Sequence, residues 1–247
     1  MTFQRFANVV LRLLIKILLD CEVDGLENLP EEGPLIGVQN HMISIDTVIG
    51  VAFIDREIVG MSKVENYSNP LLSVLFRAYG TFPVKRGEVD RQALRTSLAV
   101  LKEGKVLMVA PEGTRSKTHT LQKGKDGLSY IAVKSGAPIL PIAIWGQEEF
   151  WNQLRRLRRT RVRVVFGKPF ALDPGVGKLT REQLTQMTHE MMYRIAALLP
   201  AEYRGCYSDL SAATEEYVRS VESWRRPEAS LGRKGRGAVF SKGGVRG

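Results

Sequence analysis

Short apolar runs rich in β-branched residues recur along the first two thirds of the chain and are typical of buried strands. Polar segments and helical patterns separate these runs. The strands predicted in this way cover residues 21–24, 35–39, 57–61, 81–84, 105–109, 139–144 and 161–166.

Helical patterns alternate with the predicted strands and define the fold class. Asp90 is an N-cap for a helix with an apolar stripe that Gly104 ends, and a second helical pattern covers residues 127–136. Thr180 and Gln183 form a capping box for a longer helix whose apolar side chains face inward. The alternation predicts an α/β fold with a largely parallel sheet flanked by helices.

The N-terminal segment 6–19 is apolar apart from a narrow polar stripe. Asn8, Arg12 and Lys16, with Arg5 before them, fall at helical spacing on one side. The charges keep every apolar run short of the ~20 residues that a membrane span requires, and acidic residues follow where a signal peptide has small ones. We expect an amphipathic helix that lies in a membrane interface with its cations directed to headgroups. A helix buried against the body is the alternative.

The length and composition favour one globular domain with appendages. A chain of 247 residues with 44% hydrophobic residues can bury a full core, which excludes disordered, collagen-like and disulfide-scaffold classes. No linker rich in serine, proline and glycine interrupts residues 20–200. We therefore expect a membrane-association helix at residues 1–20, a folded domain at residues 21–226 and a basic, glycine-rich disordered tail at residues 227–247.

The formal net charge of +10 is concentrated in two segments. Residues 153–168 hold six arginines and one lysine with no acid, and residues 225–247 hold seven cations against one acid. The remaining chain is slightly acidic, so the two segments point to an anionic surface, either lipid or nucleic acid. The two cysteines, Cys21 and Cys206, form neither a disulfide framework nor a zinc site, which favours a reducing compartment.

The first candidate for chemistry is the segment Asn-His-Met-Ile-Ser-Ile-Asp at residues 40–46. His41 follows a predicted buried strand, where α/β sheets place their active crevices. His41 and Asp46 would lie about 140° apart on a continuous helix, so they meet only if a turn separates them. Asp46 would then occupy the first turn of a helix over residues 47–53, and its carboxylate would fix the imidazole tautomer and leave the other nitrogen as a base.

Three further motifs follow in order along the chain. They are Thr-Phe-Pro-Val-Lys-Arg-Gly at residues 81–87, Pro-Glu-Gly-Thr-Arg-Ser at residues 111–116 and Ala-Pro-Ile-Leu-Pro-Ile at residues 137–142. Together with the His41 motif, this ordered set resembles the glycerolipid acyltransferase family, the lysophosphatidic acid (1-acylglycerol-3-phosphate) acyltransferases with their HxxxxD motif. The resemblance covers roughly residues 23–169.

The resemblance implies roles for particular residues. His41 would be the general base, and Asp46 would orient it. The site for the acceptor's phosphate would comprise Lys85, Arg86, Glu112, Gly113, Thr114 and Arg115. The acyl-donor side would be shaped by Pro138 and Pro141. Two departures stand out: Ile43, followed by Ser44, occupies the position where the family commonly has a small polar residue, and Ala110 stands where a phenylalanine is usual.

The resemblance also implies a glycerol-phosphate-acyltransferase-like fold and an O-acyltransferase of phospholipid biosynthesis. The reaction would move an acyl chain from acyl-CoA or acyl-carrier protein, as co-substrate, to the free hydroxyl of lysophosphatidic acid and give phosphatidic acid. No nucleophile elbow is present and neither cysteine has a histidine nearby in sequence, so direct attack in a ternary complex, with backbone amides at the oxyanion, is the mechanism left. No metal or other cofactor is expected. The enzyme would work as a peripheral or monotopic protein on the cytoplasmic face of an anionic membrane.

Other functions stay open from the residues alone. Glycerol 3-phosphate or another lysolipid is an alternative acceptor. A non-catalytic basic protein that binds nucleic acid or an anionic membrane could use the arginine cluster, with Trp145, Phe150 and Trp151 stacking on bases. A His-Asp metal hydrolase lacks a third and fourth ligand at metal spacing. The arginines are also compatible with a solvated helix end that runs into an edge strand, on which Arg161 and Arg163 face outward.

Overall fold

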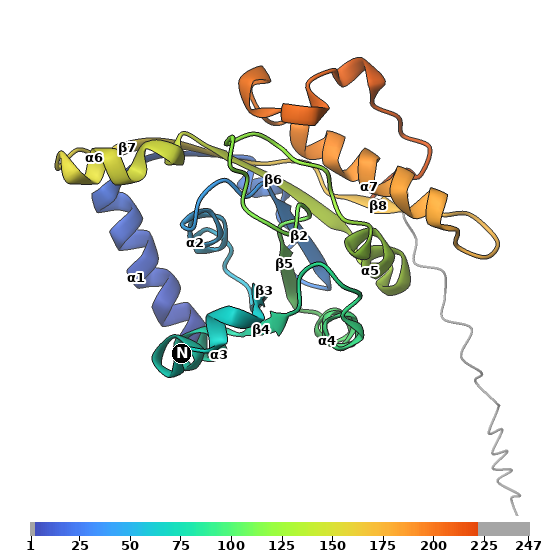
Figure 1. The fold of residues 1–247 in the computed structure, drawn as a ribbon, viewed down its shortest axis with the longest axis horizontal. Helices are drawn as coiled ribbons and strands as arrows, with labels where there is room; N and C mark the ends of the chain where they lie inside the picture. The colour runs from blue at the N-terminus through green and yellow to red at the C-terminus, as the bar shows by residue number, and fades with distance from the viewer. Residues whose placement is uncertain (1–2, 222–247) are drawn as a thin grey trace, which may run out of the picture.

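A nine-stranded mixed sheet forms the centre of the computed structural model, which describes residues 3–221 (Figure 1). Along the main path the strand order is β1-β7-β6-β2-β5-β3-β4, while β8 pairs with β6 and β9 pairs with β8. Three strand pairs are antiparallel, namely β6–β7, β6–β8 and β8–β9, and the other pairs are parallel. The strands are β1 (Leu19–Asp24), β2 (Leu35–Gln39), β3 (Ile58–Lys63), β4 (Thr81–Val84), β5 (Val106–Val109), β6 (Ile139–Trp145), β7 (Thr160–Phe166), β8 (Phe170–Leu172) and β9 (Val218–Ser220).

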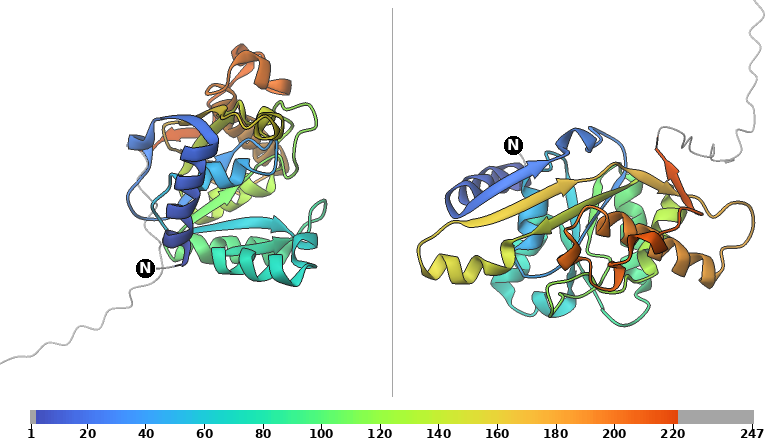
Figure 2. Two further views of the ribbon diagram at one scale, coloured as in Figure 1. Left: turned by 90° about the vertical axis from the view of Figure 1, so that its left-hand side faces the viewer. Right: turned by 90° about the horizontal axis from the view of Figure 1, so that it is seen from above.

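Helices cover both faces of the sheet and complete a three-layer α/β architecture (Figures 1 and 2). One face packs against α1 and α2, and the other packs against α4, α5 and α7. The helices are α1 (Phe3–Leu18), α2 (Asp46–Ala52), α3 (Pro70–Tyr79), α4 (Arg91–Lys102), α5 (Gly127–Ser135), α6 (Phe150–Arg155) and α7 (Arg181–Ala196). The predicted fold class, a largely parallel sheet flanked by helices, is confirmed.

Strand β2 shows why this sheet is buried on both sides. Leu35 belongs to the apolar core beneath α1 and α2, whereas Ile36 and Val38 belong to the core beneath α4, α5 and α7. All three side chains have no exposed surface. A continuous apolar run is the pattern of a central parallel strand, because its alternating side chains enter two different cores. The chain that leaves β2 therefore starts from a fixed position.

Strand β7 is an inner strand of the sheet and not the edge strand that is one of the alternatives for the arginine segment. It lies between β6 and β1, so β1 is the edge strand. Arg161 and Arg163 do face outward, as the alternating pattern predicts, but Arg163 pairs with Glu22 (3.0 Å) and Asp24 (2.8 Å) of β1. Paired charges on a solvent-facing surface resemble the exposed side of an edge strand in sequence, which is why the sequence alone leaves that alternative open.

Helix α1 directs the middle of its polar stripe to the protein. Asn8 is buried and contacts the Ile54 carbonyl and the Tyr79 hydroxyl, and Arg12 donates to the Ala52 carbonyl, whereas Arg5 and Lys16 are exposed. These polar side chains satisfy backbone carbonyls, so the apolar residues are left on the outer face. The expectation that the whole stripe is directed to lipid headgroups is therefore wrong.

The apolar outer face of α1 lies on the outside of the molecule (Figure 2). It consists of Phe3, Phe6, Val9, Val10, Leu13, Leu14 and Ile17, each 39–59% exposed. Within residues 3–221, no helix has both the length and the apolar character needed to cross a bilayer. The predicted disordered tail at residues 227–247 lies outside the described residues.

Candidate active site

The predicted site residues gather at the carboxyl ends of the parallel strands. β2 leads into His41, β5 leads into Glu112, and β4 leads into Arg86. Because β6, β2, β5, β3 and β4 are successive neighbours that run in the same direction, their carboxyl ends share one edge of the sheet. The position is the crevice in which open α/β sheets bind their ligands.

A sharp turn brings His41 and Asp46 together, as the spacing predicts. His41 Nδ1 lies 3.2 Å from Asp46 Oδ2, and the same oxygen accepts hydrogen bonds from the backbone amides of Met42 and Ile43. Asp46 is the first residue of α2 and has no exposed surface. The carboxylate thus closes the turn and holds one imidazole nitrogen, while Nε2 is left for another partner.

The loop after β5 holds the backbone of His41 from both sides. The His41 amide donates to Glu112 Oε1 (2.9 Å), and the Ser116 amide donates to the His41 carbonyl (2.8 Å). Glu112 Oε2 accepts from the Gln122 amide at 3.0 Å. The side chain is buried, and this burial raises the pKa of Glu112 against the opposing effect of its hydrogen bonds.

These contacts change the interpretation of Glu112. Its two carboxylate oxygens are directed to backbone amides and not to a solvent-filled space. These contacts support a structural role for Glu112 in holding the His41 backbone, and its part in the acceptor's phosphate site stays a prediction. Gly113 has a φ of 71°, a left-handed value, and this turn directs Arg115 away from Glu112.

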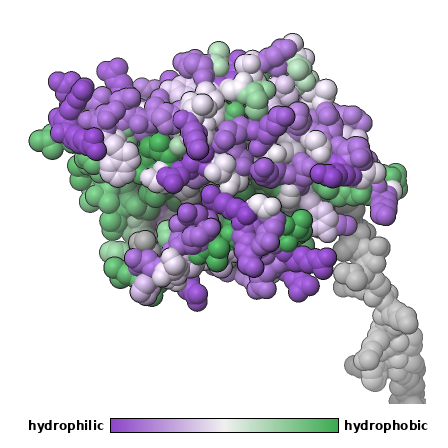
Figure 3. Space-filling model, in the orientation of Figure 1, coloured by the Kyte–Doolittle hydropathy of each residue, from purple (hydrophilic) through white to green (hydrophobic). Residues whose placement is uncertain are grey.

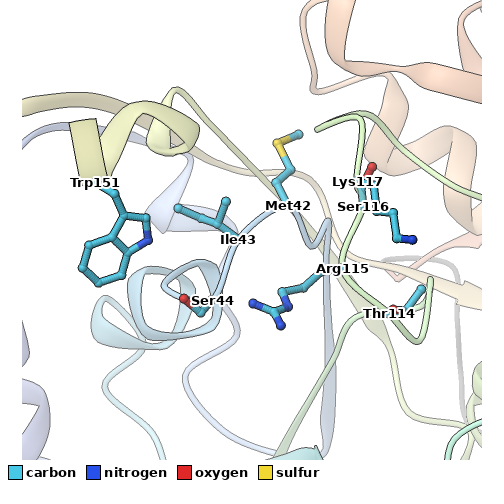
Figure 4. A pocket seen from close by; sticks show the side chains of 8 residues that line it. All are labelled: Met42, Ile43, Ser44, Thr114, Arg115, Ser116, Lys117 and Trp151. Carbon is cyan, nitrogen blue, oxygen red and sulfur yellow. The ribbon is translucent and has the colours of Figure 1, made fainter. Parts of the chain in front are cut away.

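A pocket of about 390 Å³ opens beside the His41 turn (Figure 4). Trp151, Ile43 and Ser44 lie on one side of it, and Met42, Thr114, Ser116 and Lys117 lie on the other, with Arg115 between the two groups. Sequence reasoning missed Lys117 and gave Trp151 no place in the active site. The full lining is Met42, Ile43, Ser44, Thr114, Arg115, Ser116, Lys117 and Trp151.

Two cations from separate motifs approach the same region. Desolvation lowers the pKa of Arg86, Glu65 opposes this shift, and the charge of Arg115 adds to it. Arg86 follows β4 and Arg115 lies in the loop after β5, and the charge of Arg115 is one of the influences on the pKa of Arg86. Lys85 points elsewhere, because its amine lies 3.7 Å from Glu88 and its side chain is 67% exposed. Of the two adjacent cations, Arg86 is the one associated with the pocket's arginine.

The two prolines of the last motif do not lie at the site. Pro138 precedes β6, and its carbonyl accepts from the Ile36 amide near the start of β2. His41 follows Ile36 by five residues, which span about 16 Å in an extended chain. Pro141 is buried within β6 and lies against Gly167. The role of these prolines on the acyl-donor side stays a prediction.

Two residues that sequence reasoning missed connect the dyad to β6. Asn40 donates to the Ile144 carbonyl (2.7 Å) and accepts from the Ile144 amide (2.8 Å). Gln147 donates to Asp46 Oδ1 at 3.0 Å, although the two residues are 101 positions apart. No local pattern marks Gln147, and only the pairing of β6 with β2 identifies it. Within residues 3–221, no cluster of three or more His, Cys, Asp or Glu side chains is arranged to hold a metal ion.

Comparison with known proteins gives consistent matches. The family model described as Acyltransferase matches residues 20–145. A 1-acyl-sn-glycerol-3-phosphate acyltransferase of Bacillus subtilis is 24% identical over 195 residues, which are 78% of this chain and 96% of that protein. The chloroplastic enzyme LPAT1 of Arabidopsis thaliana is 30% identical over 152 residues, which are 60% of this chain and 42% of that longer protein. The crystal structure of the LPA acyltransferase PlsC from Thermotoga maritima is similar with a TM-score of 0.54 and 28% identity, covering 77% of this chain and 80% of that chain.

Proposed function

The chain belongs to the acyltransferase family, and on this premise we propose that it transfers an acyl chain from a thioester to the free hydroxyl of lysophosphatidic acid, which yields phosphatidic acid. The observation that carries this proposal is the placement of the His41–Asp46 pair beside Arg86 and Arg115 at one edge of the sheet. A general base and a receptor for a phosphate monoester are the two features that this acceptor requires.

The dyad supports direct transfer. The acceptor's hydroxyl oxygen attacks the thioester carbonyl while His41 Nε2 takes the hydroxyl proton, and Asp46 keeps Nδ1 protonated. Collapse of the tetrahedral intermediate breaks the carbon–sulfur bond, and the thiol leaves with the proton from His41. The Met42 and Ile43 amides already donate to Asp46, so the oxyanion must be stabilised by donors from another segment.

The cations define the acceptor end of the pocket. A phosphate monoester carries nearly two negative charges, and two converging guanidinium groups can bind its oxygens in a bidentate manner. The phosphate would relieve the repulsion between Arg86 and Arg115, and Lys117 lines the same pocket as Arg115. The acyl donor in this proposal is a thioester of coenzyme A or of acyl-carrier protein.

The outer surface supports work at a membrane. The apolar face of α1 continues to α3, where Leu71, Val74 and Leu75 are 53–78% exposed. Figure 3 shows the apolar surface on the side where α1 lies, below a strongly polar region at α6. This polar region includes exposed arginines at positions 155, 156 and 158, next to Leu157, which is 94% exposed. Apolar side chains bordered by arginines suit an anionic lipid surface, which for this reaction is the cytoplasmic face of a membrane.

Turnover by the purified protein tests the proposal. The protein is incubated with lysophosphatidic acid and an acyl thioester, and phosphatidic acid is quantified by mass spectrometry. Wild type should form phosphatidic acid, and His41→Ala should lower kcat by the ~10²–10⁴ expected of a general base while the fold is kept. Glycerol 3-phosphate and another lysolipid, offered separately, distinguish the alternative acceptors. A folded His41→Ala variant with near-normal kcat would remove His41 from the mechanism.

A further inference from the structure

We propose that Gln147 is a positioning residue for acyl transfer, acting through Asp46 on the orientation of the His41 imidazole. The inference rests on the proposed roles of His41 and Asp46. It concerns a residue just beyond the segment that the family model matches, which ends at residue 145. The role is indirect, because the Gln147 side-chain amide contacts Asp46 and not the substrate.

The hydrogen bonds of Asp46 divide between its two oxygens. Oδ2 receives His41 Nδ1 and the amides of Met42 and Ile43, whereas Oδ1 receives Gln147 Nε2 at 3.0 Å. A buried carboxylate needs donors at both oxygens. Since the two oxygens are rigidly joined, a donor on Oδ1 restricts rotation of the carboxylate and keeps Oδ2 directed at His41.

The fold fixes the position of the Gln147 amide. Gly146 ends β6 with a φ of 87°, and a Cβ atom at this position would lie 2.4 Å from the Arg161 carbonyl oxygen of β7. A side chain is therefore excluded, and the left-handed glycine allows the chain to turn closely against β7. Gln147 follows in this turn and has no exposed surface.

The other member of the dyad is attached to the same end of β6. Asn40, which immediately precedes His41, forms two hydrogen bonds with Ile144. Gln147 Nε2 lies 3.4 Å from the Ile144 carbonyl oxygen as well. The distance between base and carboxylate is thus set by two side-chain amides that share one strand end, in addition to the turn of residues 41–46.

The Gln147 side chain is not optimised for packing alone. Its Oε1 atom is buried and has no hydrogen-bond partner among the described residues. A buried amide oxygen without a donor costs free energy, and an apolar side chain of the same size would avoid that cost. The donor that Nε2 provides to Asp46 is the feature that an apolar residue would lack.

Replacement by an isosteric apolar residue tests the donor. Gln147→Met keeps the length of the side chain and removes its N–H groups. We expect kcat to fall about 10–100-fold through misorientation of the base, with KM for the acceptor within about twofold of wild type. The matched control is Ser129→Ala, which removes a buried 2.8 Å hydrogen bond to Thr188 between α5 and α7. It should lower thermal stability without changing kcat.

A second variant, Gln147→Glu, gives a readout that a structural role would not produce. When protonated, the new carboxyl group can donate to Asp46 as the amide does; when ionised, it has no proton to donate and repels Asp46. Its kcat relative to wild type should therefore fall about tenfold or more between pH 6 and pH 9. Glu148, the adjacent acid, accepts from the Tyr203 hydroxyl. Glu148 and His41 are present in both proteins, so their contributions cancel in the ratio of the two kcat values.

The outcomes separate this inference from the proposed function. An inactive His41→Ala variant with Gln147→Met turnover within twofold of wild type overturns the role of Gln147 alone. A fully active His41→Ala variant, or a wild-type protein without turnover, overturns the dyad and with it this inference. If Gln147→Met does not fold, the pH profile of Gln147→Glu decides, and a profile parallel to that of wild type rejects the proposal.

Discussion

Removal of Arg86 should weaken the use of phosphorylated acceptors selectively. A hydrogen bond to a charged partner contributes about 1.5–3 kcal/mol, and the exposure of Arg86 to solvent favours the lower end of this range. Arg86→Ala should therefore reduce kcat/KM for lysophosphatidic acid about tenfold, since 1.4 kcal/mol corresponds to a factor of ~10. Arg115 stays available, and loss of its cationic neighbour leaves it free to approach the phosphate more closely.

The double variant measures whether the two arginines share one anion. If both contact the same phosphate, Arg86→Ala and Arg115→Ala together should cost more than the sum of the two single changes, because the second change removes the remaining receptor. Initial rates are compared for lysophosphatidic acid and for an uncharged monoacylglycerol. Arg95→Ala, at an exposed position on α4, serves as the matched control and should leave both rates unchanged.

The acceptor dependence refutes or supports the assignment. Loss of kcat/KM for lysophosphatidic acid with a much smaller loss for monoacylglycerol supports a phosphate receptor. Equal losses for both acceptors would mean that Arg86 and Arg115 serve the fold or the thioester donor. Strict additivity, with losses limited to the phosphorylated acceptor, would place the two arginines on different parts of that acceptor.

Three other predictions address the membrane surface, the buried acid and the thiols. Leu13→Asp and Ile17→Asp, at positions 59% and 58% exposed, should each weaken sedimentation with anionic vesicles at high salt by about tenfold or more, with the melting temperature nearly unchanged. Burial raises the pKa of Glu112 above its ordinary value of 4.5, so the folded state holds this proton more tightly than the unfolded state. The resulting contribution to the free energy of unfolding is present below pH 4.5 and is lost as the pH rises through the raised pKa. Urea titrations should therefore show that the advantage of wild type over Glu112→Gln shrinks from about pH 4.5 to about pH 7. Cys206 is exposed, and burial raises the pKa of Cys21 to about 11, so maleimide at pH 8 should label Cys206 first, as peptide mass spectrometry would show.

Local patterns in the sequence predict the elements whose environment is set within a few residues. The apolar run at 35–39 is a buried strand, the Asp90 side chain caps α4 by accepting from the Ala93 amide, and Thr180 and Gln183 form the capping box of α7. The turn between His41 and Asp46 belongs to the same class, because a five-residue spacing and a following helix constrain it. In each case the deciding contacts join residues that are close in sequence.

Contacts between distant segments account for the parts that sequence patterns miss. Glu112 and Arg115 occur in one motif, yet the left-handed turn at Gly113 sends the first inward and the second to the pocket. Helix α1 looks amphipathic in either orientation, and contacts with distant residues, among them the carbonyls of Ala52 and Ile54 and the Tyr79 hydroxyl, decide that Asn8 and Arg12 face the protein. Periodicity gives the separation of polar and apolar sides, but not which side the body requires.

Helix α2 connects the two halves of the proposed function. Its first residue, Asp46, holds the base, and its outer side packs against α1, where Val48 and Leu14 line a small apolar hollow. The cations Arg86 and Arg115 lie on other segments, after β4 and in the loop after β5. A lysophospholipid has the same division, with an anionic headgroup at one end and an apolar chain at the other. If a headgroup binds at the arginines, as proposed, we expect its chain to lie on the side of α1, with the hydroxyl group at His41 and the chain near the exposed apolar surface.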